Sequence, residues 1–294
     1  MKVLVTGGTG FVGPRIVHAL RARELAVRAL VRDPVQAAQL ASWGAELHRG
    51  DITDAGSVAE ALDGCTHVVH LVAIIKGRPE AFKRVMVDAT DSLVAASKAA
   101  GVERFTLMSA LGTSEASKDS VPYYAAKWAM EQAVQASGLE HTIFRPSFVF
   151  GRGGALPTFV KQVRYSPVVT VIGDGRQRSQ PVWVEDVAAA FAASVGEPRA
   201  ANRTFALAGP DVVDWNDLYL LIARMLGKRR RLLHVPFGLA RAGALATQRL
   251  PGAPLTADQV TMLQGADSTA ESSEAADLFG LQPVPLAEQI RRSL

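Results

Sequence analysis

Three side chains have types and spacings that suit proton transfer. Tyr123 and Lys127 are four residues apart, which on a helix places both on one face. A lysine ammonium in that position lowers the pKa of the phenol toward the working pH. Ser109 follows an apolar run, where its hydroxyl can hold a substrate oxygen. We therefore expect Ser109, Tyr123 and Lys127 to form a catalytic group, although a helical Tyr–Lys pair and a serine at a strand end also occur without one.

A glycine-rich segment stands directly after the first apolar run and before a helical pattern. It contains Gly8-x-Gly10-x-x-Gly13. Glycine is needed at such a turn because the backbone must approach a pyrophosphate closely, and the helix N-terminus then offers free N–H groups and a positive dipole end. The segment predicts a dinucleotide site, with an ordinary Gly-rich turn as the alternative. The expected cofactor contacts here are Gly7, Thr9, Gly10, Phe11, Val12 and Gly13, and the Lys127 ammonium can bind the ribose.

The end of the second strand pattern bears on the choice between NAD and NADP. Arg32 stands where an acidic ribose ligand often sits, and an arginine there suits a 2′-phosphate. Asp33 is the rival, either as a ribose ligand for NAD or as the cap of a helix that Pro34 begins. We favour NADP(H), with NAD as the alternative. Asp51 and Ile52 end the third strand pattern, where the carboxylate can meet the adenine amino group or serve only as a turn residue.

Alternating strand and helix patterns must position these residues. Such alternation predicts βαβ units, and right-handed crossovers then favour an α/β fold with a doubly wound parallel sheet. We expect strands over 2–5, 26–31, 45–49, 67–73, 105–108 and 142–144, and helices from about 15 and over 35–43, 57–62, 80–100 and 123–137.

The second half of the chain has a looser pattern. Gly153, Gly154 and Pro157 indicate a loop, and further strands are expected over 168–172, 181–184 and 204–207. Helices are expected over 185–195, 214–226, 237–249 and 256–264. We expect residues 1–153, completed by 181–207, to form the dinucleotide-binding domain. Residues 154–180 and 208–294 then form a smaller α+β lobe on the substrate side.

Together these motifs resemble the short-chain dehydrogenase/reductase superfamily, in its extended and atypical branches. The loop TGGTGFVG and Tyr123-x-x-x-Lys127 carry the likeness to the superfamily. The later strings QPVWVEDV, TFALAGP and PLTADQV look like the NAD(P)H-binding accessory subunit of respiratory complex I and its bacterial epimerase/dehydratase-like relatives. The resemblance covers nearly the whole chain and implies a Rossmann fold. It also implies further cofactor contacts at Leu71, Val72, Ala73, Pro146 and Phe148, although Phe148 suits plain core equally well.

The same resemblance implies roles for the catalytic group and leaves the function open. It makes Tyr123 the proton donor or acceptor, Lys127 the residue that lowers its pKa, and Ser109 the residue that orients a carbonyl. We expect an NAD(P)(H)-dependent oxidoreductase acting on a small carbonyl, alcohol or quinone-like substrate. The alternatives are a cofactor-binding structural or assembly protein of a respiratory membrane complex, and a nucleotide-sugar epimerase or dehydratase.

The sequence departs from the family pattern at two places, one in the expected proton relay and one at the diphosphate position of nucleotide-sugar enzymes. Met86 stands where many members have an asparagine, and a thioether cannot organise the same water relay. In Gly173-Asp174-Gly175-Arg176-Gln177-Arg178-Ser179, Ser179 takes the place of the arginine that binds the substrate diphosphate in nucleotide-sugar enzymes. Arg178 is one step earlier, and one step on an extended segment turns a side chain to the opposite face. The epimerase reading is therefore disfavoured, unless a bulge restores the register.

Composition excludes several other classes. The 294 residues include 32 Lys and Arg against 28 Asp and Glu, a net charge of +4, and no basic stripe typical of a nucleic-acid binder. The single cysteine, Cys65, excludes internal disulfides and a Cys-rich metal site, and His70 has no second ligand at metal spacing, so we expect no metal. No apolar run approaches membrane-spanning length, which predicts a cytoplasmic protein.

One segment concentrates the positive charge. Residues 228–249 carry six Lys or Arg and no acid, which leaves the rest of the chain at 26 − 28 = −2. This segment is either a solvated basic turn before a core helix or a contact with an anionic membrane surface or membrane complex. The expected partner is otherwise a small-molecule substrate. The sequence leaves the oligomeric state unknown.

Overall fold

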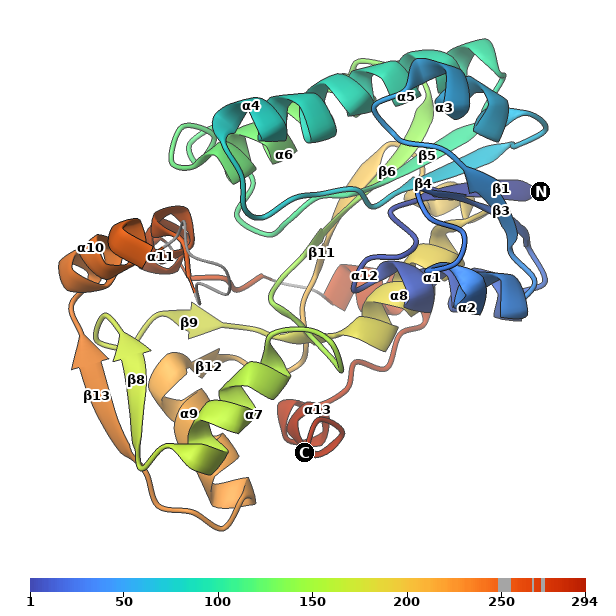
Figure 1. Cartoon of the computed structure of the whole chain (residues 1–294). Coiled ribbons are helices and arrows are strands. Elements are labelled where there is room, and N and C mark those ends of the chain that lie inside the picture. The colour runs from blue at the N-terminus through green and yellow to red at the C-terminus, as the bar shows by residue number, and fades with distance from the viewer. Residues whose placement is uncertain (248–254, 266, 271–272) are drawn as a thin grey trace.

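The computed structural model describes residues 1–247, 255–265, 267–270 and 273–294, and these form two lobes (Figure 1). The larger lobe is built on a seven-stranded sheet in the order β11-β6-β5-β4-β1-β2-β3, in which every neighbouring pair is parallel. The order reverses between β1 and β4, so a crevice is expected at their carboxyl ends. The strands span Lys2–Thr6 (β1), Ala26–Val31 (β2), Glu46–Arg49 (β3), His67–His70 (β4), Arg104–Met108 (β5), Glu140–Pro146 (β6) and Arg203–Leu207 (β11).

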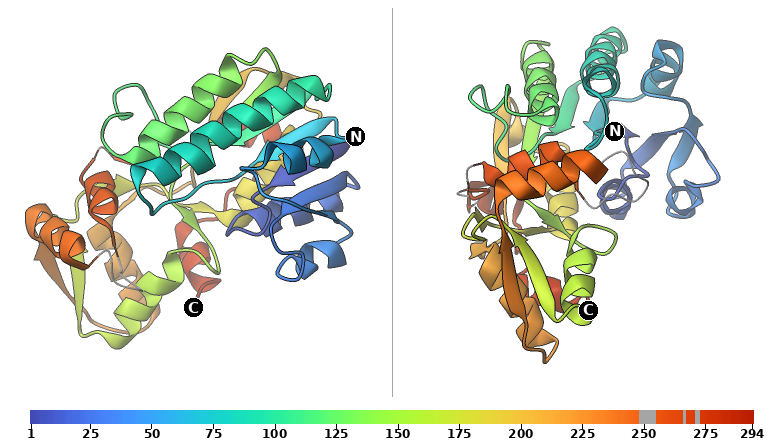
Figure 2. Two further views of the ribbon diagram at one scale, coloured as in Figure 1. Left: turned by 45° about the horizontal axis from the view of Figure 1, so that its top comes forward. Right: turned by 60° about the vertical axis from the view of Figure 1, so that its left-hand side comes forward.

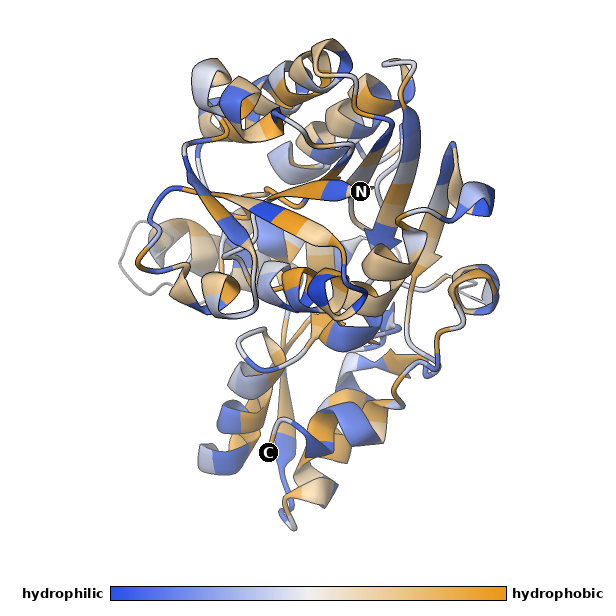
Figure 3. Ribbon diagram, turned by 90° about the vertical axis from the view of Figure 1, so that its right-hand side faces the viewer, coloured by the Kyte–Doolittle hydropathy of each residue, from blue (hydrophilic) through white to orange (hydrophobic). Residues whose placement is uncertain are grey.

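Helices cover both faces of this sheet, so its central strands are buried on both sides (Figure 2). Figure 3 shows hydrophobic stretches in these strands, as a doubly covered parallel sheet requires. One face carries α1 (Gly13–Ala22), α2 (Ala38–Ser42), α8 (Val184–Ser194) and α12 (Ser273–Phe279). The other carries α3 (Ala55–Leu62), α4 (Pro79–Phe82), a π-helical turn η1 (Lys83–Asp88), α5 (Ala89–Ala99) and α6 (Pro122–Gln135).

The smaller lobe is a mixed α+β unit with its own core. That core combines aliphatic side chains with a cluster of aromatic rings, in which Phe159 packs edge-on against Trp215 and Tyr219 with ring centroids 5.6 and 5.7 Å apart. Its main elements are α7 (Leu156–Tyr165), β8 (Val168–Ile172), α9 (Trp215–Met225), β13 (Arg231–Val235), α10 (Phe237–Thr247), α11 (Ala257–Gln264) and α13 (Leu286–Arg291). Short strands lie between the lobes or at their junction: β7 (Val149–Phe150), β9 (Arg178–Ser179), β10 (Val182–Trp183) and β12 (Val213–Asp214). The 3₁₀ turn η2 (Pro198–Ala200) belongs to the larger lobe, where it precedes β11.

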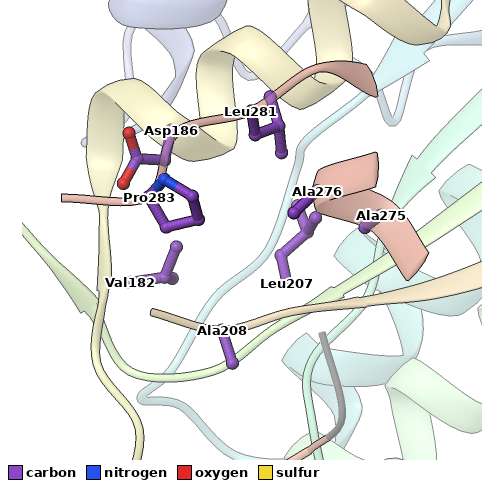
Figure 4. Close-up of a pocket in the computed structure, with 8 residues that line it drawn as sticks. All are labelled: Val182, Asp186, Leu207, Ala208, Ala275, Ala276, Leu281 and Pro283. Carbon is purple, nitrogen blue, oxygen red and sulfur yellow. The ribbon is translucent and has the colours of Figure 1, made fainter. Parts of the chain in front are cut away.

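Asp186 of α8 holds the C-terminal segment by a hydrogen bond. The Asp186 carboxylate accepts the backbone N–H of Val284 at 2.8 Å. The same carboxylate borders a small apolar pocket lined by Leu207, Ala275 and Pro283, shown in Figure 4. Burial raises the pKa of Asp186 to about 6, because apolar neighbours disfavour its charged form.

The predicted fold class is confirmed, with local differences. Asp33 does not cap a helix that begins at Pro34: its Oδ1 accepts the N–H of Val35 in a turn, and α2 begins only at Ala38. The strand expected over 67–73 ends at His70, and the helix expected over 80–100 contains the π-helical turn. Residues 248 and 249 of the helix expected over 237–249 lie outside the described residues.

Candidate active site and dinucleotide crevice

The glycine segment forms a tight cradle at the switch point of the sheet. Gly7 has φ +77°, and a Cβ there would lie 3.0 Å from the backbone of Leu71 and Val72 beyond β4. A Cβ on Gly13 would lie 2.3 Å from the carbonyl oxygen of Gly7. Only glycine fits these two positions, which permits the tight turn and the close packing of helix on strand that a dinucleotide site needs. The residues present therefore fit a dinucleotide.

The first helix presents its N-terminus to this cradle. Val12 is buried at the N-cap and Pro14 occupies the first turn, where its missing N–H is tolerated. Thr9 and Gly10 are exposed on the loop, where their backbone can reach a ligand. The Phe11 ring lies against Gly151 and Gly154, so this residue joins the cradle to the connection between the lobes.

Arg32 and Asp51 lie at the adjacent carboxyl ends of β2 and β3. Arg32 is exposed, as a ligand for a 2′-phosphate must be. Asp51 Oδ1 accepts the backbone N–H and the hydroxyl of Thr53, at 2.9 and 2.7 Å. These two bonds, with smaller contributions from Arg32 and Arg84, lower the pKa of Asp51. Asp51 thus has the turn role considered as its alternative, and Arg84 is a second cation here that the sequence analysis missed.

The remaining expected cofactor contacts are distributed along the crevice and beyond it. Leu71 is buried and its N–H bonds Thr6 O at 3.1 Å, whereas Val72 is half-buried and Ala73 exposed. Ile52 is buried three residues beyond the end of β3, and Pro146 is buried as the last residue of β6. Phe148 packs on Trp215, with ring centroids 5.5 Å apart, and so belongs to the aromatic core of the smaller lobe.

Lys127 connects the expected catalytic residues. It is 1% exposed, and its Nζ donates to the carbonyl oxygen of Met108 at 2.6 Å, directly before Ser109. The same Nζ lies 5.9 Å from the centroid of the Tyr123 ring. Ser109 is buried and its Oγ donates to Thr113 Oγ1 at 3.4 Å. The structure therefore brings Lys127 between the end of β5 and the tyrosine ring, as the helical spacing predicted.

The electrostatics of this group differ from the sequence expectation. Burial lowers the pKa of Lys127 to about 7, opposed by the nearby Glu131 carboxylate. Burial raises the pKa of the half-buried Tyr123, and Tyr124 adds to the rise. The prediction that the ammonium brings the phenol pKa down toward working pH is wrong for this structure, because burial disfavours the phenolate and the neighbouring Tyr124 disfavours it further.

A buried ion pair lies one helical turn below Lys127. Glu131 is fully buried and binds Arg145 of β6 in bidentate fashion, with Nε–Oε1 at 2.9 Å and Nη2–Oε2 at 2.5 Å. The ion pair raises the pKa of Arg145. Sequence analysis missed Glu131, although its four-residue spacing from Lys127 placed it on the same helical face.

His70 is a core residue, as expected. Its Nδ1 lies 2.6 Å from Thr6 Oγ1 and its Nε2 lies 3.0 Å from Thr90 Oγ1. Complete burial lowers its pKa to about 3, so the ring is neutral. Thr90 in turn donates to the carbonyl oxygen of Met86, which is buried within the π-helical turn. Among the described residues no group of side chains is arranged to hold a metal ion.

The smaller lobe lacks a free arginine at the expected diphosphate position. Ser179 is buried, whereas Arg178 is exposed and forms an ion pair with Asp267 at 2.7 Å. The Arg178 backbone N–H also bonds Asp267 Oδ1, at 2.8 Å. The two residues face opposite sides of β9, as the one-residue shift predicted.

The fold recurs in proteins of known activity. A ceramide reductase of Caulobacter vibrioides is 33% identical over 83% of this chain and 76% of its own length. Subunit 9 of the 1 alpha subcomplex of rat mitochondrial NADH dehydrogenase [ubiquinone] is 29% identical over 96% of this chain and 76% of its own length. An NADPH-dependent quinone oxidoreductase of Escherichia coli, solved with NADPH, superimposes with a TM-score of 0.80 at 22% identity, over 98% of each chain.

A family model covers most of the chain. It matches residues 3–208, which include the glycine cradle, the expected catalytic residues and all of the seven-stranded sheet except Lys2. With the parallel sheet and the glycine cradle at its switch point, this match shows that the chain belongs to the NAD dependent epimerase/dehydratase family.

Proposed function

We propose that the protein is an NAD(P)H-dependent reductase of a carbonyl or quinone-like substrate. The observation that carries this proposal is the placement of Lys127, whose Nζ binds the carbonyl before Ser109 and lies 5.9 Å from the Tyr123 ring. A substrate carbonyl at this point meets a serine hydroxyl and a phenol. When bound, the nicotinamide cofactor supplies the hydride.

Tyr123 is the proton donor of the proposed reduction. Burial raises the pKa of its phenol, so Tyr123 carries at neutral pH the proton that a reduced carbonyl oxygen must receive. Ser109 orients the oxygen, and Lys127 fixes the geometry through Met108 and donates to the ribose.

We further propose NADP(H) as the preferred cofactor. Arg32 is exposed at the carboxyl end of β2, and both Arg32 and Arg84 help to lower the pKa of Asp51. Two cations there suit a 2′-phosphate better than a bare ribose diol. Titration calorimetry with NADPH and NADH tests this assignment. An Arg32→Ala variant is expected to lose most of the preference for NADPH, and equal affinities for both cofactors in the native protein would refute it.

The substrate class follows from the relatives and from the smaller lobe. A ceramide reductase is among the relatives, and the arginine nearest the expected diphosphate position is paired with Asp267. Both observations favour a carbonyl substrate without a nucleoside diphosphate. Saturable binding of a UDP-sugar would support the epimerase reading instead.

A turnover assay with matched tyrosine variants tests the reductase. The native protein is mixed with NADPH and a panel of aldehydes, ketones and quinones, and NADPH oxidation is followed by absorbance. Tyr123→Phe is expected to lower kcat by about two orders of magnitude or more, since a positioned acid contributes at least that much. Tyr124→Phe is the control, because Tyr124 is one residue out of register. Equal loss in both variants would contradict the assigned role.

A second candidate is a cofactor-binding assembly or structural protein of a membrane complex. Met86 in place of an asparagine and the likeness to the rat NADH dehydrogenase subunit favour it. Tight NADPH binding without turnover across the panel, in native protein and Tyr123→Phe alike, would decide for this candidate.

A further inference from the structure

Helix α10 is apolar almost all round, yet it is largely exposed. Its eleven residues, Phe237–Thr247, contain a single charged side chain, Arg241, and only Ala244 is buried. Leu239 is 66% exposed and Leu245 51%. A helix with so little polar surface is normally buried in a core or in lipid. At 100° per residue, Leu239 and Ala242 lie opposite the buried Ala244, so the apolar side of α10 faces outward.

A two-stranded ribbon extends this apolar surface. In the parallel pairing of β13 with β8, Arg231 lies beside Val168, Leu233 beside Thr170 and Val235 beside Ile172. Residues paired in this way share one face of the ribbon. Leu233 is 54% exposed and Val168 is 40% exposed on that face. Figure 1 shows β13 and α10 along the left-hand edge of the smaller lobe, with α10 at its end toward the larger lobe and away from α2 and α3.

The chain segment that forms α10 and β13 carries charge of one sign. No acidic residue occurs between Asp217 and Asp258, whereas that stretch contains seven Lys or Arg. Lys228, Arg229, Arg231 and Arg241 are exposed. Arg230 instead holds the turn in place by donating to the carbonyl oxygens of Val163 and Arg164, at 2.6 and 3.1 Å. On the neighbouring loop, the carboxylate of Asp174 accepts the backbone N–H of Arg176.

We propose that α10 and the exposed face of the β8–β13 ribbon bind the surface of an anionic lipid bilayer. Exposed leucines flanked by arginines are the pattern of interfacial binding, in which apolar side chains enter the acyl boundary and cations meet lipid phosphates. The helix lies on the bilayer and does not cross it, because eleven residues span only about 16 Å of a core about 30 Å thick. No described helix is long and apolar enough to span a membrane. The proposal holds whether or not the protein is a reductase.

Vesicle binding by the full chain tests this surface. Vesicles of phosphatidylcholine with one part in three phosphatidylglycerol are compared with phosphatidylcholine alone, by co-sedimentation at low and high salt. Binding is expected to the anionic vesicles only, and to weaken with salt. The double variant Arg231→Glu, Arg241→Glu is expected to bind at least ~20-fold more weakly, since each cation near the surface is worth about fivefold. Arg23→Glu, an exposed arginine of the larger lobe, is the matched control.

Leucine variants test the apolar part separately. Leu239→Ser with Leu245→Ser is expected to abolish sedimentation with anionic vesicles, whereas Leu220→Ser, an exposed leucine of α9, is expected to leave it unchanged. Retained NADPH binding and an unchanged circular dichroism spectrum show that each variant is folded. Equal binding to both vesicle types, or binding insensitive to the α10 variants, would overturn the proposal. A concentration-dependent dimer that the leucine variants dissociate would also overturn it, by assigning the surface to a second copy.

Discussion

The two side chains of the buried ion pair Glu131–Arg145 differ in exposure, and this difference predicts which of them is more costly to remove. The Glu131 side chain is fully buried, whereas that of Arg145 is 27% exposed. Removing Arg145 therefore leaves a carboxylate that water cannot reach. Removing Glu131 leaves a guanidinium that is still partly hydrated. We expect Arg145→Met to destabilise the protein more than Glu131→Gln does.

The magnitudes follow from the cost of an uncompensated buried group. Loss of one partner from a buried pair typically costs about 3–5 kcal/mol, which applies to Arg145→Met. Glu131→Gln keeps a hydrogen-bond acceptor beside the partly exposed arginine, so we expect the free energy of unfolding to fall by only about 1–3 kcal/mol. The double variant Glu131→Met, Arg145→Met removes both charges and replaces them with apolar volume. It is expected to be more stable than Arg145→Met alone, so the two changes are not additive.

Urea unfolding at pH 7 and 25 °C, followed by circular dichroism, measures these differences as changes in midpoint at constant slope. Glu115→Gln serves as the control, because Glu115 pairs with Lys118 at the surface and little change is expected there. If Arg145→Met were no more destabilising than Glu131→Gln, the asymmetric burial would not govern the pair. Additive effects in the double variant would show that Glu131 and Arg145 do not stabilise the protein as a pair.

Three further predictions concern titration and the glycine cradle. The pKa of Lys127 falls from 10.5 to about 7 on folding, so between these pH values the unfolded chain holds more protons than the folded one. The free energy of unfolding therefore rises with pH in this range, by up to about 1.4 kcal/mol per pH unit. Lys127→Met is expected to remove this slope in urea unfolding at pH 7, 8 and 9. The pKa of His70 falls from 6.5 to about 3, so stability declines as pH drops from 6.5, and His70→Gln should flatten the decline; an equally steep decline would count against the neutral buried ring. Gly13→Ala places a Cβ 2.3 Å from Gly7 O and should abolish NADPH binding in calorimetry; unchanged affinity would show that the cradle is not the binding site.

The fold was predictable where local and global signals agree. Apolar runs mark the sheet strands, and Gly64, Gly101 and Gly138 follow their helices with positive φ, the conformation that favours glycine there. The prediction failed where one residue type serves two structures. Asp33 before Pro34 suits a helix cap and a turn equally, and the turn forms because Asp33 bonds the N–H of Val35.

Several elements were not predicted, and α7 and β13 show the physical reasons. Helix α7 follows closely on Gly153 and Gly154, which indicated a loop, and the loop ends sooner than the glycines suggest. Strand β13 begins at Arg231, inside a basic run that favoured a solvated turn. Its pairing with β8 outweighs that preference, because sheet pairing is decided by a partner distant in sequence.

The chemical group was found by spacing, whereas its electrostatics needed the tertiary structure. Tyr123, Lys127 and Glu131 follow one another at four-residue intervals, and burial deepens from half-buried to complete along them. Burial alone drives Lys127 toward neutrality, and Glu131 opposes this only in part because its carboxylate is bound to Arg145. Lys127 donates to the carbonyl oxygen of Met108 and so holds the end of β5 in place. In the reductase that we propose, the same ammonium also holds the ribose, and Tyr123 gives its proton to the substrate oxygen.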